Sequence, residues 1–282
     1  MSYLKELEKK DNSMEEFVLP NMEQSGEFTE DELAEDMDGL NVSFQRIKIP
    51  SGGGLQFEIP GDNPEDPEYA KYLTGVILFA NPANAYWPEG SKQDEAQPPT
   101  CMSYDGKNGH GDPGGVCATC PMNVYGTGKN GSGKACKNMR HLYILRSGEY
   151  IPIQFNLPPT SLKAYGDFAT TAFLSRRRAT YGSVVQIGLK KMNNGKDDYS
   201  IATFKRLYDL DGEQLQQIKP LAIGFREQIK GMIEHGEIEP MTDDAFEIST
   251  DLSALEPLGN LPTDGSFATN TPVNNGNTML PQ

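Results

Sequence analysis

All four cysteines of the chain lie in one glycine-rich stretch, and this clustering constrains the fold more than any other feature. Cys101, Cys117, Cys120 and Cys136 form a C-x15-C-x2-C-x15-C pattern within 36 residues. Nine glycines fall between positions 106 and 133 of the same stretch. A segment with so few apolar side chains cannot fold by burying them, so we expect it to need a cross-link or a metal.

The cysteine spacing favours a zinc ion. Two thiolates in a C-x2-C pair can bind one tetrahedral ion, and the two outer cysteines complete a four-sulfur shell. We therefore predict structural Zn²⁺ bound by Cys101, Cys117, Cys120 and Cys136. A closed shell leaves no position for an activated water, which argues against a catalytic metal. An iron–sulfur cluster and disulfides are the alternatives, and His110 could replace one ligand.

The sequence contains no sign of export or membrane insertion. No apolar run approaches the roughly 18 residues of a membrane-spanning helix. The first residues, Met1 to Glu6, lack the basic start and apolar stretch of a signal peptide. We expect an intracellular protein with no membrane partner.

The net charge of −15 is distributed unevenly. Residues 1–40 contain 13 acidic and 3 basic residues, and residues 232–282 contain 9 acidic residues and no lysine or arginine. Residues 129–206 instead contain 14 basic and 4 acidic residues. The sequence therefore predicts a basic body between two acidic arms, so the overall acidity does not exclude a nucleic-acid partner. Charge that only keeps the chain in solution is the plainer alternative.

Composition and hydrophobic patterning divide the chain into three regions. Residues 1–40 are predicted to be a largely disordered acidic arm and 240–282 a flexible acidic and polar tail. The core spans 41–239 and contains the zinc insertion at about 88–140.

Within the core, alternation and turn residues predict the secondary structure. The expected elements are a hairpin over 42–59, strands at 76–79, 141–145 and 150–155, a helix over about 158–178, a hairpin over 184–204 and a helix over 213–235. We predict a mainly β, α+β fold: an oligonucleotide-binding (OB) type barrel with a zinc-binding loop insertion, two helices and acidic termini. Another small α+β domain is the alternative.

Basic and aromatic residues are interleaved in the second half of the core. Positive charge that follows a phosphate backbone, together with rings on which bases stack, is typical of single-strand binding. For each ring, packing in the core is the competing interpretation. The candidate nucleic-acid-binding residues are Tyr125, Lys129, Lys134, Lys137, Arg140, Tyr143, Arg176, Arg177, Arg178, Lys190, Lys191, Lys205 and Arg206.

The sequence does not favour an enzyme. Gly128 to Lys134 matches part of a phosphate-binding loop, but Ala135 follows where serine or threonine would bind Mg²⁺. The three histidines lie in no known nucleophile motif, and most carboxylates lie in the arms. We predict a protein that binds without catalysis.

Several of these motifs resemble one family. The segments Cys117 to Gly126, Gly133 to Lys137 and Leu157 to Lys163 resemble phage-encoded single-stranded DNA-binding proteins, with similarity over about 75–230. The resemblance implies an OB-type barrel with a zinc-bearing insertion, an arrangement similar to the zinc-containing barrel of eukaryotic replication protein A. It also implies a location in the host cytoplasm. Many such proteins end in an acidic tip, whereas residues 274–282 here are uncharged.

The sequence therefore predicts a sequence-tolerant single-stranded DNA-binding protein for phage DNA replication or recombination. Its acidic arms would compete with DNA or recruit replication or recombination proteins. The alternative is a zinc-ribbon adaptor or regulatory protein that binds protein partners through its acidic arms. A zinc-dependent nuclease or a primase accessory is more distant.

Overall fold

The computed structural model describes residues 17–20, 44–61, 63, 66–88 and 98–235. The predicted tail at 240–282, and the predicted arm at 1–40 apart from residues 17–20, lie outside the described residues. Four of the strands precede the cysteine stretch: β1 (Arg46–Ile47), β2 (Phe57–Ile59), β3 (Glu68–Ala70) and β4 (Leu73–Tyr86). The cysteine stretch contains β5 (Cys101–Ser103), β6 (Asn108–Gly111) and β7 (Gly115–Val116). The remaining strands are β8 (Lys137–Leu145), β9 (Ile153–Leu157), β10 (Ser183–Asn193) and β11 (Asp198–Asp209).

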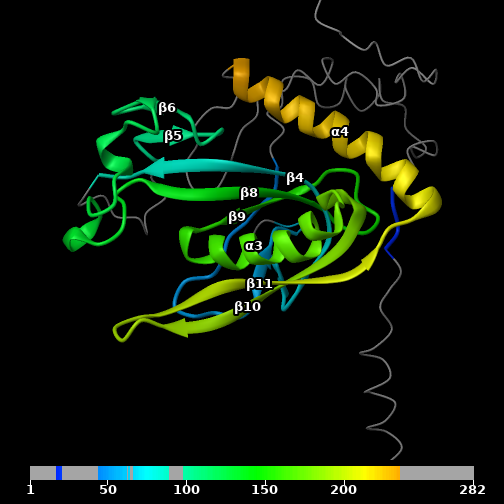
Figure 1. Cartoon of the computed structure of the whole chain (residues 1–282). Helices are drawn as coiled ribbons and strands as arrows, with labels where there is room; N and C mark the ends of the chain where they lie inside the picture. The colour runs from blue at the N-terminus through cyan, green and yellow to red at the C-terminus, as the bar shows by residue number, and fades with distance from the viewer. Residues whose placement is uncertain (1–16, 21–43, 62, 64–65, 89–97, 236–282) are drawn as a thin grey trace, which may run out of the picture.

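The protein is mixed α+β and is built on one large sheet. Its strand order is β1-β9-β8-β4-β5-β6-β7, with β10 also paired to β4 and β11 paired to β10 (Figure 1). The helices are α3 (Pro159–Ala172) and α4 (Gly212–His235). In the part of the chain that the structure describes, β11 pairs only with β10, so the sheet does not close into a barrel.

Strand β4 connects the parts of the sheet. It pairs with β8 from Val76 to Ala85, with β10 at its beginning and with β5 at its end, all antiparallel. Pro82 is tolerated in this central strand because the β10 ladder ends at Val76 and the β5 ladder begins at Asn84. The missing N–H of Pro82 therefore interrupts no ladder on that edge.

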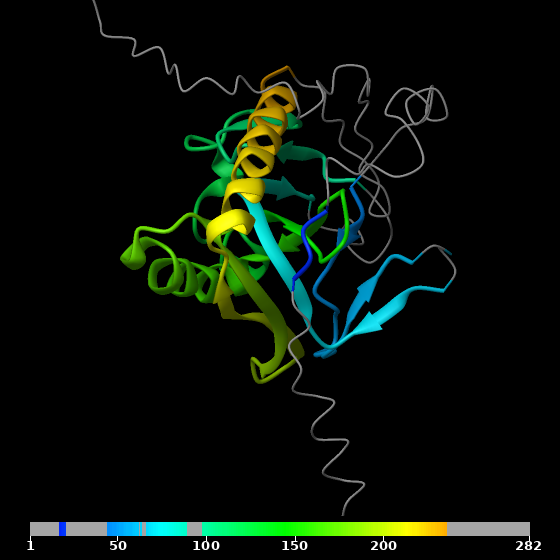
Figure 2. The same ribbon diagram turned by 90° about the vertical axis from the view of Figure 1, so that its right-hand side faces the viewer.

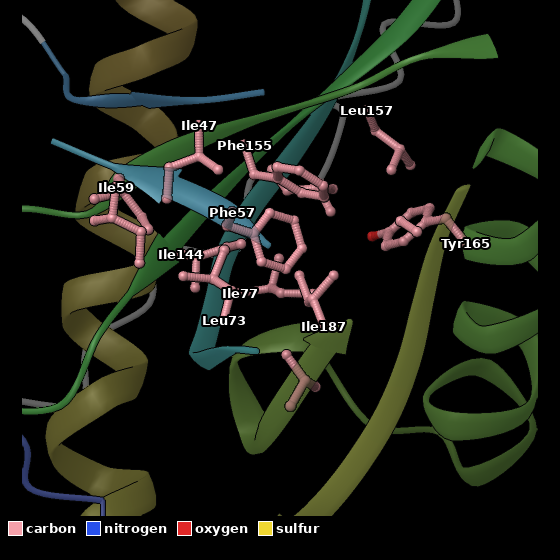
Figure 3. Packing of buried hydrophobic residues seen from close by; sticks show 14 of the residues in the cluster. Ile47, Phe57, Ile59, Leu73, Ile77, Ile144, Phe155, Leu157, Tyr165 and Ile187 are labelled. Carbon is pink, nitrogen blue, oxygen red and sulfur yellow. The ribbon is translucent and has the colours of Figure 1, made fainter. Parts of the chain in front are cut away.

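The two faces of the sheet carry two hydrophobic clusters. One face is covered by α4, whose residues Ile218, Ala222, Phe225, Ile229 and Met232 recur at helical spacing and pack on Val76, Leu78, Tyr143 and Leu145. The other face packs against α3 and β2, where Phe57 meets Phe155 edge to face (Figure 3). The β2–β3 pair itself projects away from both helices (Figure 2).

Three predicted features are confirmed in type and place. The hairpin of β10 and β11 turns at Asn193 to Gly195, β8 and β9 are joined at Ser147-Gly148, and the last helix spans Gly212–His235.

The first four residues described, 17–20, belong to the arm predicted to be disordered, but they pack against the core. Phe17 is buried against the α4 face, and the Gly148 N–H donates to the Val18 carbonyl oxygen at 2.9 Å.

Two predicted elements are wrong in extent or partner. The expected 42–59 hairpin does not form, because β1 pairs in parallel with β9 and β2 pairs with β3. The helix expected to reach Arg178 ends at Ala172, and Arg177 adopts a left-handed backbone conformation at φ 49° after a short 3₁₀ turn. The triple arginine is therefore not a helix end.

Gly75 is required where β4 lies between β8 and β10. A Cβ at this position would collide with the Leu145 carbonyl oxygen. We expect Gly75→Ala to lower the free energy of unfolding by roughly 1–3 kcal/mol, the cost of overpacking. Urea denaturation followed by circular dichroism measures this change.

Gly166→Ala in α3 is the matched control, because a Cβ there meets no atom within 4 Å. It should stabilise the protein by roughly 0.5–1 kcal/mol. Equal stability of the two variants would contradict this account of Gly75.

Candidate metal centre and nucleic-acid interface

The four cysteines line one small enclosed cavity. The segment from Cys101 to Cys136, here called the cysteine module, connects β4 to β8. Cys101, Cys117 and Cys136 are buried and Cys120 is partly exposed, and no disulfide links them. Their shared cavity has a volume of about 10 Å³ and is also lined by Asn84, Tyr86 and Asn123. The structure therefore brings together all four predicted metal ligands.

Backbone hydrogen bonds hold the C-x2-C pair in a tight turn. The N–H of Cys120 donates to the Cys117 carbonyl oxygen at 3.4 Å, and the Asn123 side-chain amide donates to the same oxygen at 2.8 Å. The Cys136 N–H donates to the Met122 carbonyl oxygen at 2.8 Å. These bonds place both inner cysteines and Cys136 around the cavity without a hydrophobic core.

Burial and mutual proximity disfavour the thiolate forms of these cysteines. Burial, together with the neighbouring cysteines, raises the pKa of Cys136 to about 11. Burial is also the main cause of the raised pKa of Cys101. Within the described residues, no group of three or more His, Cys, Asp or Glu side chains is already arranged as a metal site. The cysteines thus share a cavity but do not have the ligand geometry of a bound ion.

An asparagine network joins the module to the sheet. Lys134 donates through Nζ to Oδ1 of Asn123 at 3.1 Å and to Oδ1 of Asn138 at 2.8 Å. The Asn138 amide donates in turn to Asn84 on β4 at 2.5 Å. Lys134 therefore has an internal structural role in addition to its predicted role at the surface. Sequence reasoning missed Asn84 and Asn138, because isolated asparagines carry no distinctive spacing.

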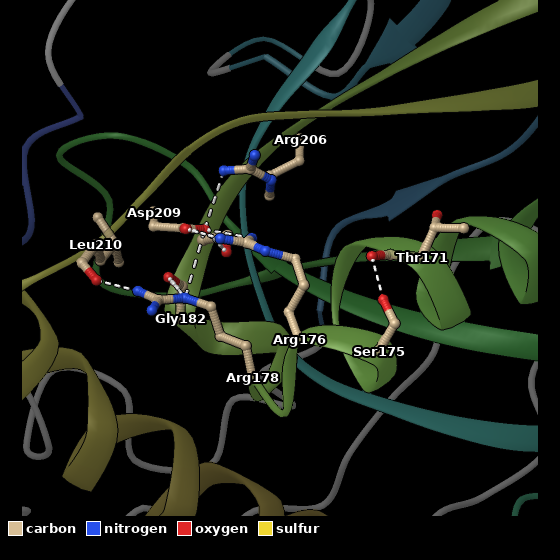
Figure 4. A network of polar contacts seen from close by, with 9 residues as sticks. Thr171, Ser175, Arg176, Arg178, Gly182, Arg206, Asp209 and Leu210 are labelled. Carbon is tan, nitrogen blue, oxygen red and sulfur yellow. Dashed lines mark hydrogen bonds and ion pairs between the residues drawn. The ribbon is translucent and has the colours of Figure 1, made fainter.

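Three of the predicted arginines converge on Asp209 (Figure 4). Arg176 approaches both carboxylate oxygens, and Arg206 lies 3.2 Å and Arg178 lies 3.4 Å from Oδ1. Arg178 also donates to the carbonyl oxygens of Gly182 and Leu210. The cluster ties the end of β11 to the chain that precedes β10. One carboxylate balances three guanidinium groups, so the cluster keeps a net positive charge.

The other predicted cations lie in different places. Lys129 is exposed on the module, which also carries Tyr125, a tyrosine that is 79% exposed. Lys190 and Lys205 are exposed on the face of the β10–β11 hairpin opposite Ala202. Lys191 forms a 2.6 Å ion pair with Asp198. Arg177 is exposed, Lys137 is partly exposed at the start of β8, and Arg140 lies in a groove beside α3.

Tyr143 is a correction to the predicted set. It is 1% exposed and packs edge to face on Phe44 and Phe225 in the cluster beneath α4. Burial raises the pKa of its hydroxyl. A ring enclosed in this way cannot stack on a nucleic-acid base. For Tyr143, packing in the core is therefore the correct interpretation, and base stacking is wrong.

The structure adds an aromatic position that the sequence analysis missed. Tyr72 is 49% exposed, and its ring lies over Gly188, where a Cβ would come within 3.2 Å of it. The Lys71 Nζ is 5.4 Å from the centre of the same ring. Two tyrosines, Tyr69 and Tyr72, flank a lysine just before β4, and this pairing of aromatic and basic residues could have identified the position.

Comparison with protein-family models, with curated proteins and with solved structures found no match. No helix of the described residues is long and apolar enough to cross a membrane.

The Asp209 cluster predicts how stability depends on pH. The hydrogen bond from Arg176 is the main reason why the pKa of Asp209 is lowered. Its stabilisation is therefore complete above the pKa of an unfolded aspartate, about 3.9, and is lost as pH falls through the lower folded value. We expect Asp209→Asn to cost roughly 1.5–3 kcal/mol at pH 7.

Urea denaturation at pH 7 and at successively lower pH measures this cost. The difference from the wild type should shrink below pH of about 4. Asp167→Asn is the control, because Asp167 forms an exposed pair with Lys163 that contributes less than about 0.5 kcal/mol. A cost at Asp209 no larger than at Asp167 would contradict the proposed role of the cluster.

Proposed function

We propose that this chain is a single-stranded DNA-binding protein that binds without catalysis and carries a structural zinc ion in its cysteine module. The observation that carries the proposal is the order in which the strands connect. β4, β8 and β9 are consecutive antiparallel neighbours, α3 follows β9, and β10–β11 is a hairpin whose first strand returns to pair with β4. This order supports the proposal, because an OB-fold is a five-stranded, partly open Greek-key barrel, although among the described residues β11 pairs with β10 alone and does not close the sheet.

This correspondence assigns roles to two loops. In OB-folds the loop between strands 1 and 2 and the loop between strands 4 and 5 flank the oligonucleotide. Here the first loop is the cysteine module and the second is the turn of the β10–β11 hairpin. Figure 1 shows both on the same side of the molecule, with α3 between them. Each of these two segments carries an exposed cation, Lys129 on the module and Lys190 on the hairpin. Exposed lysines of this kind could neutralise the phosphates of a bound strand.

The donor set of the module supports zinc. Four thiols line one cavity about the size of a single water molecule, in a segment with hardly any apolar core. Four sulfur donors are a complete tetrahedral shell for Zn²⁺, and metal binding would supply the folding energy that the segment lacks. Cys101, Cys117, Cys120 and Cys136 would provide the ligands.

A protein-binding zinc adaptor is the second candidate. The cysteine module exposes apolar side chains at Val116 (57%), Val124 (55%) and Tyr125 (79%). Clustered exposed apolar side chains are typical of protein contacts. In this case the acidic arms would bind protein partners. In the DNA-binding proposal they compete with DNA or recruit replication and recombination proteins.

The DNA-binding proposal predicts salt-dependent binding to single strands. A fluorescein-labelled dT oligonucleotide of about 16 nucleotides covers the site size of an OB-fold. Fluorescence anisotropy should show affinity that falls with salt, with a slope of about −0.7 for each phosphate contact, and weaker binding to duplex DNA. The double variant Lys190→Ala/Lys205→Ala should bind less tightly and lower the magnitude of the slope by about 1.4, the value for two phosphate contacts.

Lys219→Ala/Lys230→Ala on α4 makes the same change in charge and serves as the control. Binding of the wild type that does not respond to salt, or no binding at all, would contradict the proposal and favour the adaptor. Equal losses in the two double variants would show that only total charge matters.

The zinc proposal predicts one zinc ion per chain. Elemental analysis of the purified protein should find zinc and no iron, and Cys120→Ser should lower the zinc content and unfold the module. His110→Ala is the control, because His110 is exposed and four cysteines already complete the shell. Zinc lost from His110→Ala but retained in Cys120→Ser would overturn the four-cysteine ligand set, and iron in place of zinc would identify an iron–sulfur cluster.

A further inference from the structure

A groove runs between α3 and the β4–β8 ribbon, next to the cysteine module. Its volume is about 540 Å³, within the range of ligand-binding pockets, and it is open to solvent. Pro82 and Asn84 of β4 and Asn138 to Arg140 of β8 form one wall. Leu162, Tyr165, Gly166, Ala169 and Thr170 of α3 form the other.

Among the described residues, the one charged group in this lining is a cation, and no acidic residue of the lining pairs with it. Arg140 is half-buried, and its guanidinium lies 5.6 Å from the centre of the Tyr165 ring. None of the described residues that line the groove is an aspartate or glutamate, and no ion pair of the described residues includes Arg140. This differs from Arg176, Arg178 and Arg206, which share Asp209. A half-buried guanidinium in a lining without carboxylates is suited to an anion, and the planar guanidinium matches the geometry of phosphate in two-point contacts.

The surface beside Arg140 is shaped for a flat apolar group. A Cβ added at Gly166 would meet no atom within 4 Å, so α3 is bare at the point that faces the groove. Ala169 and Met139 continue this surface, and Leu174 is 71% exposed at the rim. The amides of Asn84 and Asn138 lie in the same lining, where hydrogen bonds to each other, to Lys134 and to Gly106 hold them in place as a fixed polar wall.

We propose that this groove holds one nucleotide of the bound single strand, with its phosphate on Arg140 and its base against α3 at Gly166. The inference rests on the proposed function, since a nucleotide supplies both the anion and the flat ring. A free carboxylate would satisfy only the arginine. Gly106 of the module also lines the groove, and α3 lies between the module and the turn of the β10–β11 hairpin (Figure 1), so a strand that contacts both would pass the groove.

Filling the groove provides the sharpest test. Gly166→Leu puts a side chain into the open space and replaces a helical glycine, so the fold should be retained or stabilised. Affinity for the fluorescein-labelled dT oligonucleotide should fall roughly fivefold to hundredfold, the range found when one stacked base is lost. Gly231→Leu is the matched control, because Gly231 is a glycine of α4 where an added Cβ also meets no atom within 4 Å. It should bind as the wild type does.

A second variant tests the phosphate contact separately. Arg140→Gln should weaken binding and lower the salt slope by about 0.7, the value for one phosphate of a single strand. An oligonucleotide carrying 5-iodouracil should cross-link to the wild type at Met139 or Tyr165 and fail to do so in Gly166→Leu. Thermal unfolding followed by circular dichroism confirms that each variant is folded.

The outcomes separate this inference from the proposed function. If the wild type does not bind the dT oligonucleotide, the proposed function itself is wrong. A wild type that binds dT, with Gly166→Leu and Arg140→Gln equally tight, overturns the groove and leaves the function intact. If Arg140→Gln binds more weakly and Gly166→Leu binds as the wild type does, Arg140 makes a phosphate contact at the surface, and the proposal that a base enters the groove is wrong. A peptide of residues 234–264 that binds the wild type but not Gly166→Leu, while dT binding is unchanged, would assign the groove to the acidic tail and overturn the proposal.

Discussion

The backbone ladder of β4 is the interaction on which the rest of the structure depends. One strand is hydrogen-bonded to β8 along most of its length, to β10 at its beginning and to β5 at its end. Close approach of the ladders requires glycine at position 75. The two faces of the same strand contribute Val76 to the cluster under α4 and Ile77 to the cluster under α3. Both helices and the cysteine module are thereby positioned by a single element.

The same ladder connects the proposed metal centre to the proposed groove. Cys101 pairs with Tyr86 at the end of β4, and Cys136 directly precedes β8, so both ends of the module are fixed to adjacent strands. Asn84 lines the cavity of the cysteines and also the groove beside α3. A zinc ion that orders the module would therefore also order one wall of the groove, which joins a structural metal to ligand binding without giving it a chemical role.

The positive charge of the core has two different uses. Arg176, Arg178 and Arg206 are held by Asp209 and stabilise the junction between β11 and the segment before β10. Lys190, Lys205 and Arg140 have no such partner in the described part of the chain, so their charge is available to a ligand. Counting basic residues along the sequence cannot separate the two groups, because Asp209 lies more than thirty positions from Arg176 in the chain.

Local interactions were predictable from the sequence by itself. The Asn-Gly turn between β10 and β11, the amphipathic spacing of α4 and the gathering of the cysteines each depend on residues close together in the chain. Only the tertiary structure decided that β1 pairs with β9 and not with β2, that Tyr143 is buried, and that Arg140 lies over Tyr165 in a groove. Strand partners and side-chain environments are set by contacts between distant segments, and alternation within one strand carries no information about its partner.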